Sequence, residues 1–162
     1  MSNSLSLRHQ TGFTLIELIV SILIVAITAA IAVPAFNEMQ ARGAIRATAS
    51  DFVTAVNVAR VQAVSLRTTV TLKPVSGSNW SSGWVIEYPA TVTTEQNQTF
   101  LPSGTSTLVS EGGLSEIQFR NNGLTNAGEA EFSLCDARSG ESGRTITISP
   151  FGKVTNEVKS CS

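Results

Sequence analysis

The chain has 162 residues, a formal net charge of −1 and 42% hydrophobic residues, which suits one modest domain with one additional element. The near-zero charge gives no electrostatic basis for nucleic acid as the main partner. The apolar residues are concentrated in the first third, and the remainder is rich in Ser, Thr, Gly and Asn, as in a β-rich exported domain.

A long apolar segment follows a short polar N-terminus. Residues 13–36 form an apolar run of about 24 residues, which is long enough to cross a bilayer as a helix. The residues that interrupt the run are Thr14, Glu17, Ser21, Thr28 and Pro34. Glu17 is the interruption that any interpretation of the segment must explain, because it is the only charged residue in the run.

Two general interpretations of this segment leave Glu17 unexplained. A cleavable secretory signal would use the small residues of Ala30-Ile31-Ala32 and the positive charge of Arg8, but the apolar run is longer than usual and contains an acid. A plain signal anchor fits the length, but an acid costs about 2.5–3.5 kcal/mol near the bilayer centre, and less if it reaches the interface. Charge does not decide the orientation, since Arg8 flanks one end and Arg42 and Arg46 flank the other.

A third interpretation comes from the junction Gly12-Phe13-Thr14-Leu15-Ile16-Glu17. This hexapeptide resembles the class III signal of type IV pilins and of the pseudopilins of type II secretion. The resemblance implies a leader over residues 1–12, cleavage between Gly12 and Phe13 by a prepilin peptidase, and N-methylation of Phe13. Glu17 becomes the fifth residue of the mature chain, where the family carries a glutamate. Pro34 falls where many pilins have a proline that bends the helix.

The physical chemistry of the junction agrees with this resemblance. A free amine on Phe13 is cationic, and a carboxylate one turn away or on a neighbouring subunit would neutralise it. Opposite charges attract strongly in a medium of low dielectric constant, whereas an unpaired buried acid tends to protonate. We therefore expect Glu17 to act in assembly, where helices from several subunits pack in a fibre core.

The helix is predicted to continue beyond the apolar segment, from Phe13 to Leu66. Pro34 would kink a continuing helix rather than end it. Residues 37–67 are amphipathic, and Asp51, Asn57 and Arg60 fall outside the apolar stripe, on a solvated or inter-subunit face. A short coiled coil and a helix docked on a sheet both suit the stripe. Its members are Ile45, Ala49, Phe52, Val56, Ala59, Ala63 and Leu66.

Short runs of alternating apolar and polar residues predict an antiparallel β domain over residues 68–162, and hence an α+β fold of six to eight strands. Pro74 and Pro89 are predicted to end the first two strands, and Asn121-Asn122-Gly123 predicts a tight turn. The runs are residues 68–72, 84–88, 99–101, 107–109, 116–120, 130–135 and 145–149. Residues 117–123, 132–135 and 144–154 resemble the minor-pilin and H-type pseudopilin branch of the family, which implies two antiparallel sheets.

Both cysteines, Cys135 and Cys161, lie near the C-terminus. If the domain is exported, a disulfide between them would close a loop of about 26 residues and stabilise the fold by roughly 3–4 kcal/mol in the chain-entropy model. If the domain is cytosolic, two buried free thiols are the alternative.

The sequence offers no catalytic constellation. Removal of the leader would remove His9, the only histidine, and with it any histidine-based nucleophile or metal site. The acid pairs Glu129 with Glu131 and Asp136 with Glu141 lie in predicted strands and loops, where solvated faces are expected. No glycine-rich stretch leads into Lys-Ser or Lys-Thr. We therefore predict no enzyme, no metal and no cofactor.

Basic residues near the C-terminus raise the alternative of a pilin that binds DNA for uptake. Acids are interspersed among them, and no stripe of basic and aromatic residues is visible apart from Phe151. The basic residues are Arg138, Arg144, Lys153 and Lys159, and the acids are Glu141 and Glu157. A solvated β surface is the expected role of this region, and DNA is not expected to be a partner.

The resemblance as a whole implies a structural subunit: a minor pilin that initiates or primes type IV pilus assembly at the fibre tip. Its expected partners are the prepilin peptidase and other minor and major pilins. It would be held in the inner membrane by a single span, with the β domain in the periplasm, before it enters the fibre. An H-type pseudopilin of type II secretion and a DNA-binding competence pilin are the alternatives.

Overall fold

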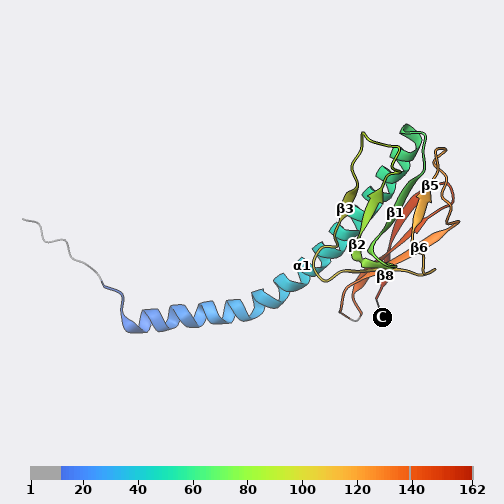
Figure 1. Cartoon of the computed structure of the whole chain (residues 1–162). Helices are drawn as coiled ribbons and strands as arrows, with labels where there is room; N and C mark the ends of the chain where they lie inside the picture. The colour runs from blue at the N-terminus through green and yellow to red at the C-terminus, as the bar shows by residue number, and fades with distance from the viewer. Residues whose placement is uncertain (1–11, 139, 162) are drawn as a thin grey trace, which may run out of the picture. The chain divides into compact units, whose positions relative to one another are not determined.

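The computed structural model of the chain describes residues 12–138 and 140–161. The predicted leader, with Arg8 and His9, therefore lies outside the described residues except for Gly12. The chain divides into two compact units, residues 1–38 and 39–162. One α-helix, α1 (Leu15–Ser65), contributes residues to both units (Figure 1). The predicted long helix is confirmed, although it begins at Leu15 rather than Phe13.

In the first unit, α1 is helical on both sides of Pro34. A proline inside a helix has no N–H for the carbonyl four residues earlier, here that of Ala30. The helix nevertheless continues through this position, as expected for a proline that bends a helix without ending it. A bend at Pro34 stays a prediction.

In the second unit, α1 packs its apolar stripe against the β-strands. Six of the seven predicted stripe residues are buried, and Leu66 is half-buried just beyond the helix end. Ala55 and Thr48 are also buried, and the Thr48 hydroxyl accepts a hydrogen bond from the backbone N–H of Ser103 at 2.8 Å. The interpretation of the stripe as a helix docked on sheets is therefore confirmed.

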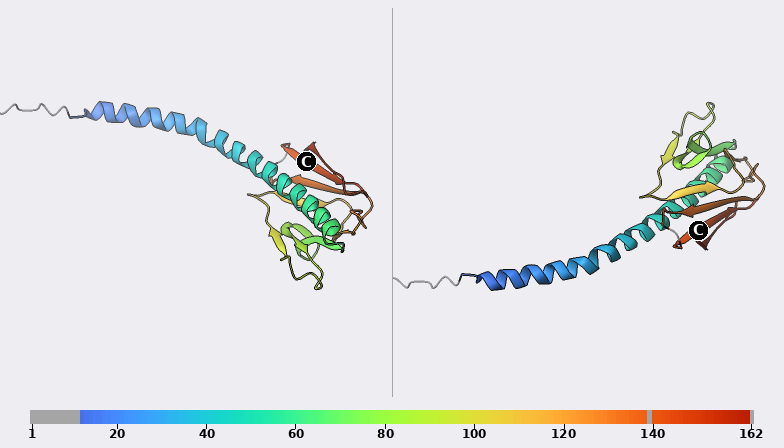
Figure 2. Two further views of the ribbon diagram at one scale, coloured as in Figure 1. Left: turned by 90° about the horizontal axis from the view of Figure 1, so that it is seen from above. Right: turned by 90° about the horizontal axis from the view of Figure 1, so that it is seen from below.

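The strands form two four-stranded antiparallel sheets, which confirms the predicted α+β fold. Sheet A has the order β3-β2-β1-β5, and sheet B has the order β4-β6-β7-β8. Seen from above and from below in Figure 2, the second half of α1 runs along the line where sheet A and sheet B adjoin. The strands are β1 (Val70–Ser76), β2 (Asn79–Glu87), β3 (Gln98–Phe100), β4 (Thr107–Ser110), β5 (Ile117–Phe119), β6 (Ala130–Cys135), β7 (Ser142–Ile148) and β8 (Val154–Ser160).

Most strand boundaries differ from the predicted runs, and β6 alone of the predicted strands keeps its bounds. Pro74 lies inside β1, where it pairs with Trp84 of β2. Because the β5 pairing of β1 ends at Leu72, the strand has a free edge at Pro74, and the missing N–H removes no ladder bond there. β2 begins at Asn79, ahead of the predicted start at residue 84, and β8 is not among the predicted runs.

An aromatic cluster links the helix to both sheets. The Phe52 ring of α1 lies 5.8 Å from Trp80 and 5.2 Å from Trp84, both of β2, in edge-to-face contacts. Its ring is also 4.8 Å from Phe132 of β6. All four side chains are buried, and such ring pairs contribute about 0.5–1.5 kcal/mol each beyond their burial. Phe52 thus fixes the helix over the place where the two sheets meet.

Arg60 departs from the expectation of a solvated or inter-subunit face, because it contacts loops of its own chain. It is half-buried, and its Nε donates a hydrogen bond to the carbonyl of Gly123 at 3.2 Å. Gly123 belongs to the predicted turn, which is confirmed, with φ of 76°. Gly152 also lies against this arginine, since a Cβ there would stand 2.7 Å from Cδ of Arg60. The arginine therefore anchors two loops to the helix.

Candidate assembly site

The predicted cleavage junction lies just before the helix begins. Gly12 and Phe13 are exposed and have no regular secondary structure. A Cβ placed on Gly12 would meet no atom within 4 Å. The Phe13 side chain is 77% exposed. The peptide bond between these residues is therefore open to a peptidase in the part of the chain that the structure describes.

Thr14 caps the N-terminus of α1. Its Oγ1 accepts a hydrogen bond from the backbone N–H of Glu17 at 3.3 Å, and its carbonyl accepts one from Leu18 at 3.2 Å. A threonine followed three residues later by a glutamate is the sequence pattern of a capping box. The carboxylate also lies in the first turn, where the positive end of the helix dipole favours an acid. Helix capping is thus a local interpretation of Glu17 that competes with the role in assembly, although its carboxylate forms no hydrogen bond to Thr14 in the part of the chain that the structure describes.

The other hydroxyl groups in the apolar part of the helix are satisfied by the helix itself. The Ser21 hydroxyl donates to the carbonyl of Glu17 at 2.7 Å, and that of Thr28 donates to the carbonyl of Ile24 at 2.9 Å. Such bonds allow a hydroxyl to lie in an apolar environment without loss of a hydrogen bond. Among the described residues, the carboxylate of Glu17 has no comparable bond or ion pair. Glu17 is therefore the polar group of this segment that still requires a partner.

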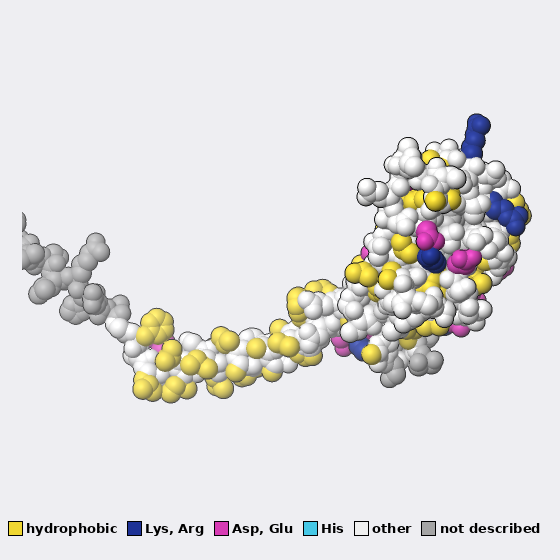
Figure 3. Space-filling view, viewed as in Figure 1, with side chains coloured by type: hydrophobic (Ala, Val, Ile, Leu, Met, Phe, Trp, Pro, Cys, Tyr) yellow, Lys and Arg dark blue, Asp and Glu magenta, His cyan; other side chains and the backbone are white. Residues whose placement is uncertain are grey.

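Large apolar side chains are exposed along the first half of α1, as Figure 3 shows. Judged by length and composition alone, α1 contains a stretch that is long and apolar enough to cross a bilayer. A soluble monomer rarely exposes so extensive an apolar surface. This surface requires a lipid environment or the packed helices of a fibre.

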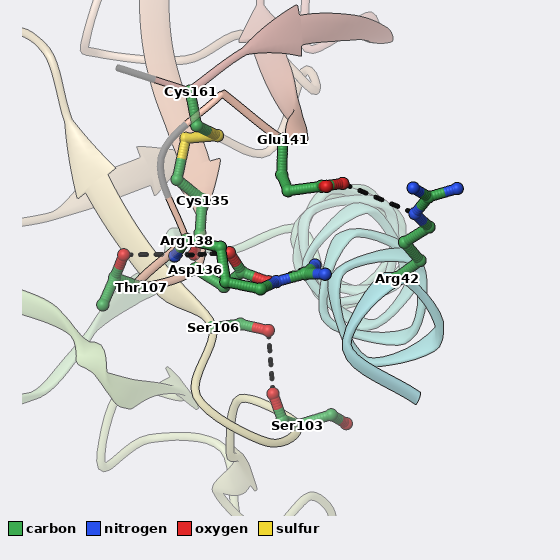
Figure 4. A network of polar contacts seen from close by, with 9 residues as sticks. All are labelled: Arg42, Ser103, Ser106, Thr107, Cys135, Asp136, Arg138, Glu141 and Cys161. Atoms are coloured by element: carbon green, nitrogen blue, oxygen red, sulfur yellow. Dashed lines mark hydrogen bonds and ion pairs between the residues drawn. A yellow bond between two sulfur atoms is a disulfide. The ribbon is translucent and has the colours of Figure 1, made fainter. Parts of the chain in front are cut away.

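At the other end of the chain, Cys135 and Cys161 form a disulfide, with 5.9 Å between their Cα atoms. Of the two alternatives for the cysteines, the bonded one is therefore present. The bond joins the end of β6 to the residue after β8, and the Cys161 N–H donates to the carbonyl of Glu141 at 2.9 Å. Figure 4 shows the carboxylate of Glu141 directed toward Arg42 of α1, at 3.4 Å. The disulfide thus holds a loop that contacts the helix.

The acids and bases of this loop are paired rather than solvated, contrary to the expectation for Asp136 and Glu141. The Asp136 side chain is 3% exposed and accepts hydrogen bonds from Nε and Nη2 of Arg138 at 2.9 and 2.7 Å. Hydrogen bonds from Arg138 hold the pKa of Asp136 below its ordinary value. Lys159 pairs with Glu111 at 3.2 Å. Within residues 12–138 and 140–161 there is no group of three or more metal-binding side chains.

Gly143 of β7 lies directly beneath the disulfide. A Cβ on this residue would overlap Sγ of Cys161 and the carbonyl oxygen of Leu134, and would stand 2.9 Å from Sγ of Cys135. Real Cβ atoms do not approach other atoms so closely. The need for glycine at this position comes from tertiary contacts, which the residues around it in the sequence do not reveal.

We predict that Gly143→Ala lowers the free energy of unfolding by about 1–3 kcal/mol, since one added methyl forces the disulfide and β6 apart. The measurement is thermal or denaturant unfolding of the full chain in detergent. Gly112→Ala is the matched control, because a Cβ there meets nothing within 4 Å. Equal stability of the two variants would contradict the predicted overlap.

The fold and the N-terminal segment together define the class of protein. A helix with an apolar, exposed first half and a second half packed on two antiparallel sheets, preceded by a Gly-Phe junction, is the architecture of a pilin-like subunit. The family model for the type II transport protein GspH matches residues 48–152. The chain belongs to this family. The model of the prokaryotic N-terminal methylation motif matches residues 7–33.

Comparison with solved structures gives the same fold. A crystal structure of the Pseudomonas aeruginosa type IV minor pilin FimU in space group P21 is 21% identical, with a TM-score of 0.62 over 75% of this chain and 97% of that chain. A second FimU crystal form, P65, is 21% identical, with a TM-score of 0.59 over 72% of this chain and 99% of that chain. A comparison with curated protein sequences gives no match.

Proposed function

We propose that the chain is a minor pilin of the type IV pilus that initiates or primes fibre assembly at the tip. The observation that carries the proposal is Glu17, one charge without a partner among the described residues, in an apolar helix that begins next to the Gly12-Phe13 junction. The fold similarity to a minor pilin and the match to the N-terminal methylation motif support it.

The proposed mechanism begins with the leader, residues 1–12, held in the cytoplasm. The prepilin peptidase cleaves between Gly12 and Phe13, and the new N-terminus of Phe13 is methylated. Residues 13–36 then store the subunit in the inner membrane as a single span, with the β domain in the periplasm. During extraction into the fibre, Glu17 pairs with the N-terminal amine of a neighbouring subunit in a low-dielectric core, where such a pair is strong.

In this proposal the second half of α1, within residues 37–67, and the β domain, residues 68–162, make the lateral and tip contacts with other minor and major pilins. The protein performs no chemistry of its own and requires no cofactor. Two of the four basic residues of the C-terminal region are paired with acids, Lys159 with Glu111 and Arg138 with Asp136. This pairing supports the exclusion of DNA as a main partner.

An H-type pseudopilin of the type II secretion pseudopilus is the second candidate. The observation that favours it is the match of residues 48–152 to the GspH family model, whose name refers to type II transport. The junction and the apolar helix serve both machines equally, because both assemble helical subunits from the same membrane.

Deletion of the gene, followed by complementation, separates the two candidates. For a minor pilin, we expect loss of surface pili and of twitching motility while type II secretion continues at the parental level. Both outputs are measured in the same strain, so that each serves as the control for the other. Intact pili with lost secretion would overturn the pilus proposal in favour of the pseudopilus.

A further inference from the structure

A groove runs between α1 and the β7–β8 pair in the second unit of the chain. It consists of two hollows of about 240 and 220 Å³ that share Arg46 of α1 and Arg144 of β7. Arg42 lines the first hollow, together with Ile45 and Val158. We call it the basic groove, after Arg42, Arg46 and Arg144. It combines three guanidinium groups with an apolar wall.

The positive charge of the basic groove is only partly neutralised. Arg42 is paired with Glu141 at 3.4 Å. Neither Arg46 nor Arg144 forms an ion pair with any residue that the structure describes. Two arginines in one hollow repel each other unless an anion lies between them. Their planar guanidinium groups suit a phosphate or a carboxylate, to which they donate paired hydrogen bonds.

The apolar wall is formed by the face of sheet B that Arg144 shares with its apolar neighbours. Arg144 pairs with Val158 across the β7–β8 ladder, so the two side chains share one face of the sheet. Buried Ile146 shares this face as well, because alternate residues of a strand point the same way. Val158 is nevertheless 68% exposed. The core-side face of β8 is therefore left open, with a charge and an apolar group side by side.

The groove lies close in sequence to the apolar segment. Arg42 and Arg46 follow Phe36 by six and ten residues, about 9 and 15 Å along a helix. In sequence, Arg42 and Arg46 are therefore the first basic residues after the apolar segment, where cationic side chains attract anionic lipid headgroups. Arg144 adds the third charge from the sheet. An inward-pointing charge near an edge strand also hinders aggregation. That role would explain Arg144, but it does not explain why Arg46 lies opposite Arg144.

We propose that the basic groove binds the phosphate of an anionic phospholipid, with the apolar wall against the glycerol and upper acyl chain. This inference rests on the proposed storage of the subunit in the membrane, and adds a specific lipid contact to it. The bound lipid would orient the β domain on the membrane surface before extraction, and it would leave the groove when the subunit enters the fibre.

The test is a titration of the full chain in uncharged detergent with short-chain phosphatidylglycerol, followed by calorimetry. Short-chain phosphatidylcholine and inorganic phosphate are the comparison ligands. The double variant Arg46→Gln/Arg144→Gln is expected to bind phosphatidylglycerol about 25-fold more weakly, from roughly five-fold for each charge near a membrane surface. Arg46→Lys/Arg144→Lys should retain part of the binding, because lysine still attracts phosphate as a point charge.

The matched control is Arg67→Gln/Arg120→Gln, which removes two arginines from another hollow, next to the C-terminal end of α1. Unchanged binding in this control, with loss in the groove variant, supports the proposal. Equal loss in both variants, or equal affinity for phosphatidylcholine, overturns it. Binding of inorganic phosphate as tight as that of the lipid assigns the groove to a free anion. If the groove variant binds the lipid normally but no longer captures a partner pilin, the basic groove is a protein contact and the lipid proposal is overturned. None of these results depends on the deletion phenotype, so the two proposals fail separately.

Discussion

Gly12→Val is expected to block removal of the leader, so that the precursor accumulates and no mature subunit appears. A peptidase must bring its catalytic groups close to the backbone at the junction, and glycine permits that approach because it has no side chain. Valine is branched at Cβ and stiff. Misplacement of a reacting bond by about 1 Å can reduce a rate roughly 100-fold, so we expect processing to fall by at least about that factor.

The structure separates this effect from a folding defect. A Cβ on Gly12 would touch nothing within 4 Å, and the residue lies outside α1. The measurement is the intact mass of the membrane-extracted chain, which distinguishes the full precursor from a chain that begins at N-methylated Phe13. Gly43→Val is the control, since Gly43 also has open space around it but lies far from the junction. A mature mass for Gly12→Val would refute the assignment of the cleavage site.

Glu17→Ala is the second change with a large expected effect. The variant should insert into the membrane and be processed normally, because it removes a charge from an apolar helix. Its incorporation into fibres should fall about ten-fold or more, since a pair of opposite charges about 4 Å apart is worth several kcal/mol in a medium of intermediate dielectric constant. The measurement is the ratio of sheared-fibre to membrane-bound subunit by immunoblot.

Two further variants distinguish the assembly role from the capping role of Glu17. Glu17→Gln keeps the length of the side chain and its place in a capping box, which accepts Glu or Gln, but it has no charge. We expect it to fail as Glu17→Ala does. Ser21→Ala is the matched control, because it removes a polar group that the helix already satisfies. Wild-type incorporation of Glu17→Gln would leave capping as the role of this residue.

Periodicity was sufficient to predict the long helix and its buried face. Ile45, Ala49, Phe52, Val56, Ala59 and Ala63 recur at helical spacing, and all of them are buried. The pattern could not identify Thr48, whose burial depends on a hydrogen bond from Ser103, a residue distant in the chain. Thr48 also lies beside the stripe, where a polar residue is normally solvated. Local spacing thus predicts a face of a helix, but not which polar groups find partners there.

The strands were predicted where alternation is strong and missed where it is weak. β6 matches its predicted bounds, and its alternate residues Ala130, Phe132 and Leu134 are buried. β8 has mostly exposed residues, so its sequence carries no contrast between two faces. The first residues of β2 are Asn, Trp and Ser, which resemble a loop in composition. Edge positions and bulges depend on neighbouring strands, which a single run of residues does not reveal.

Contacts between side chains that lie far apart in the sequence could not be predicted from the sequence alone. Arg60 contacts Gly123 and Gly152, and the Arg42–Glu141 pair joins residues about a hundred positions apart. The N-terminal junction was different, because its residues are contiguous and their order alone suggested the family. A contiguous motif can be read from the chain, whereas contacts between distant segments require the fold.

The disulfide has a consequence for how the domain comes apart. It fastens the end of an edge strand, β8, whose side chains contribute little to the buried cluster around Phe52. Proteins open in local units, and those with few buried contacts open first. Reduction would therefore release β8 by local fraying, with rapid amide hydrogen exchange in its backbone, while β1, β2 and the helix stay protected. The disulfide therefore stabilises the last strand locally, whereas the stability of the domain interior depends on the packing of the aromatic cluster.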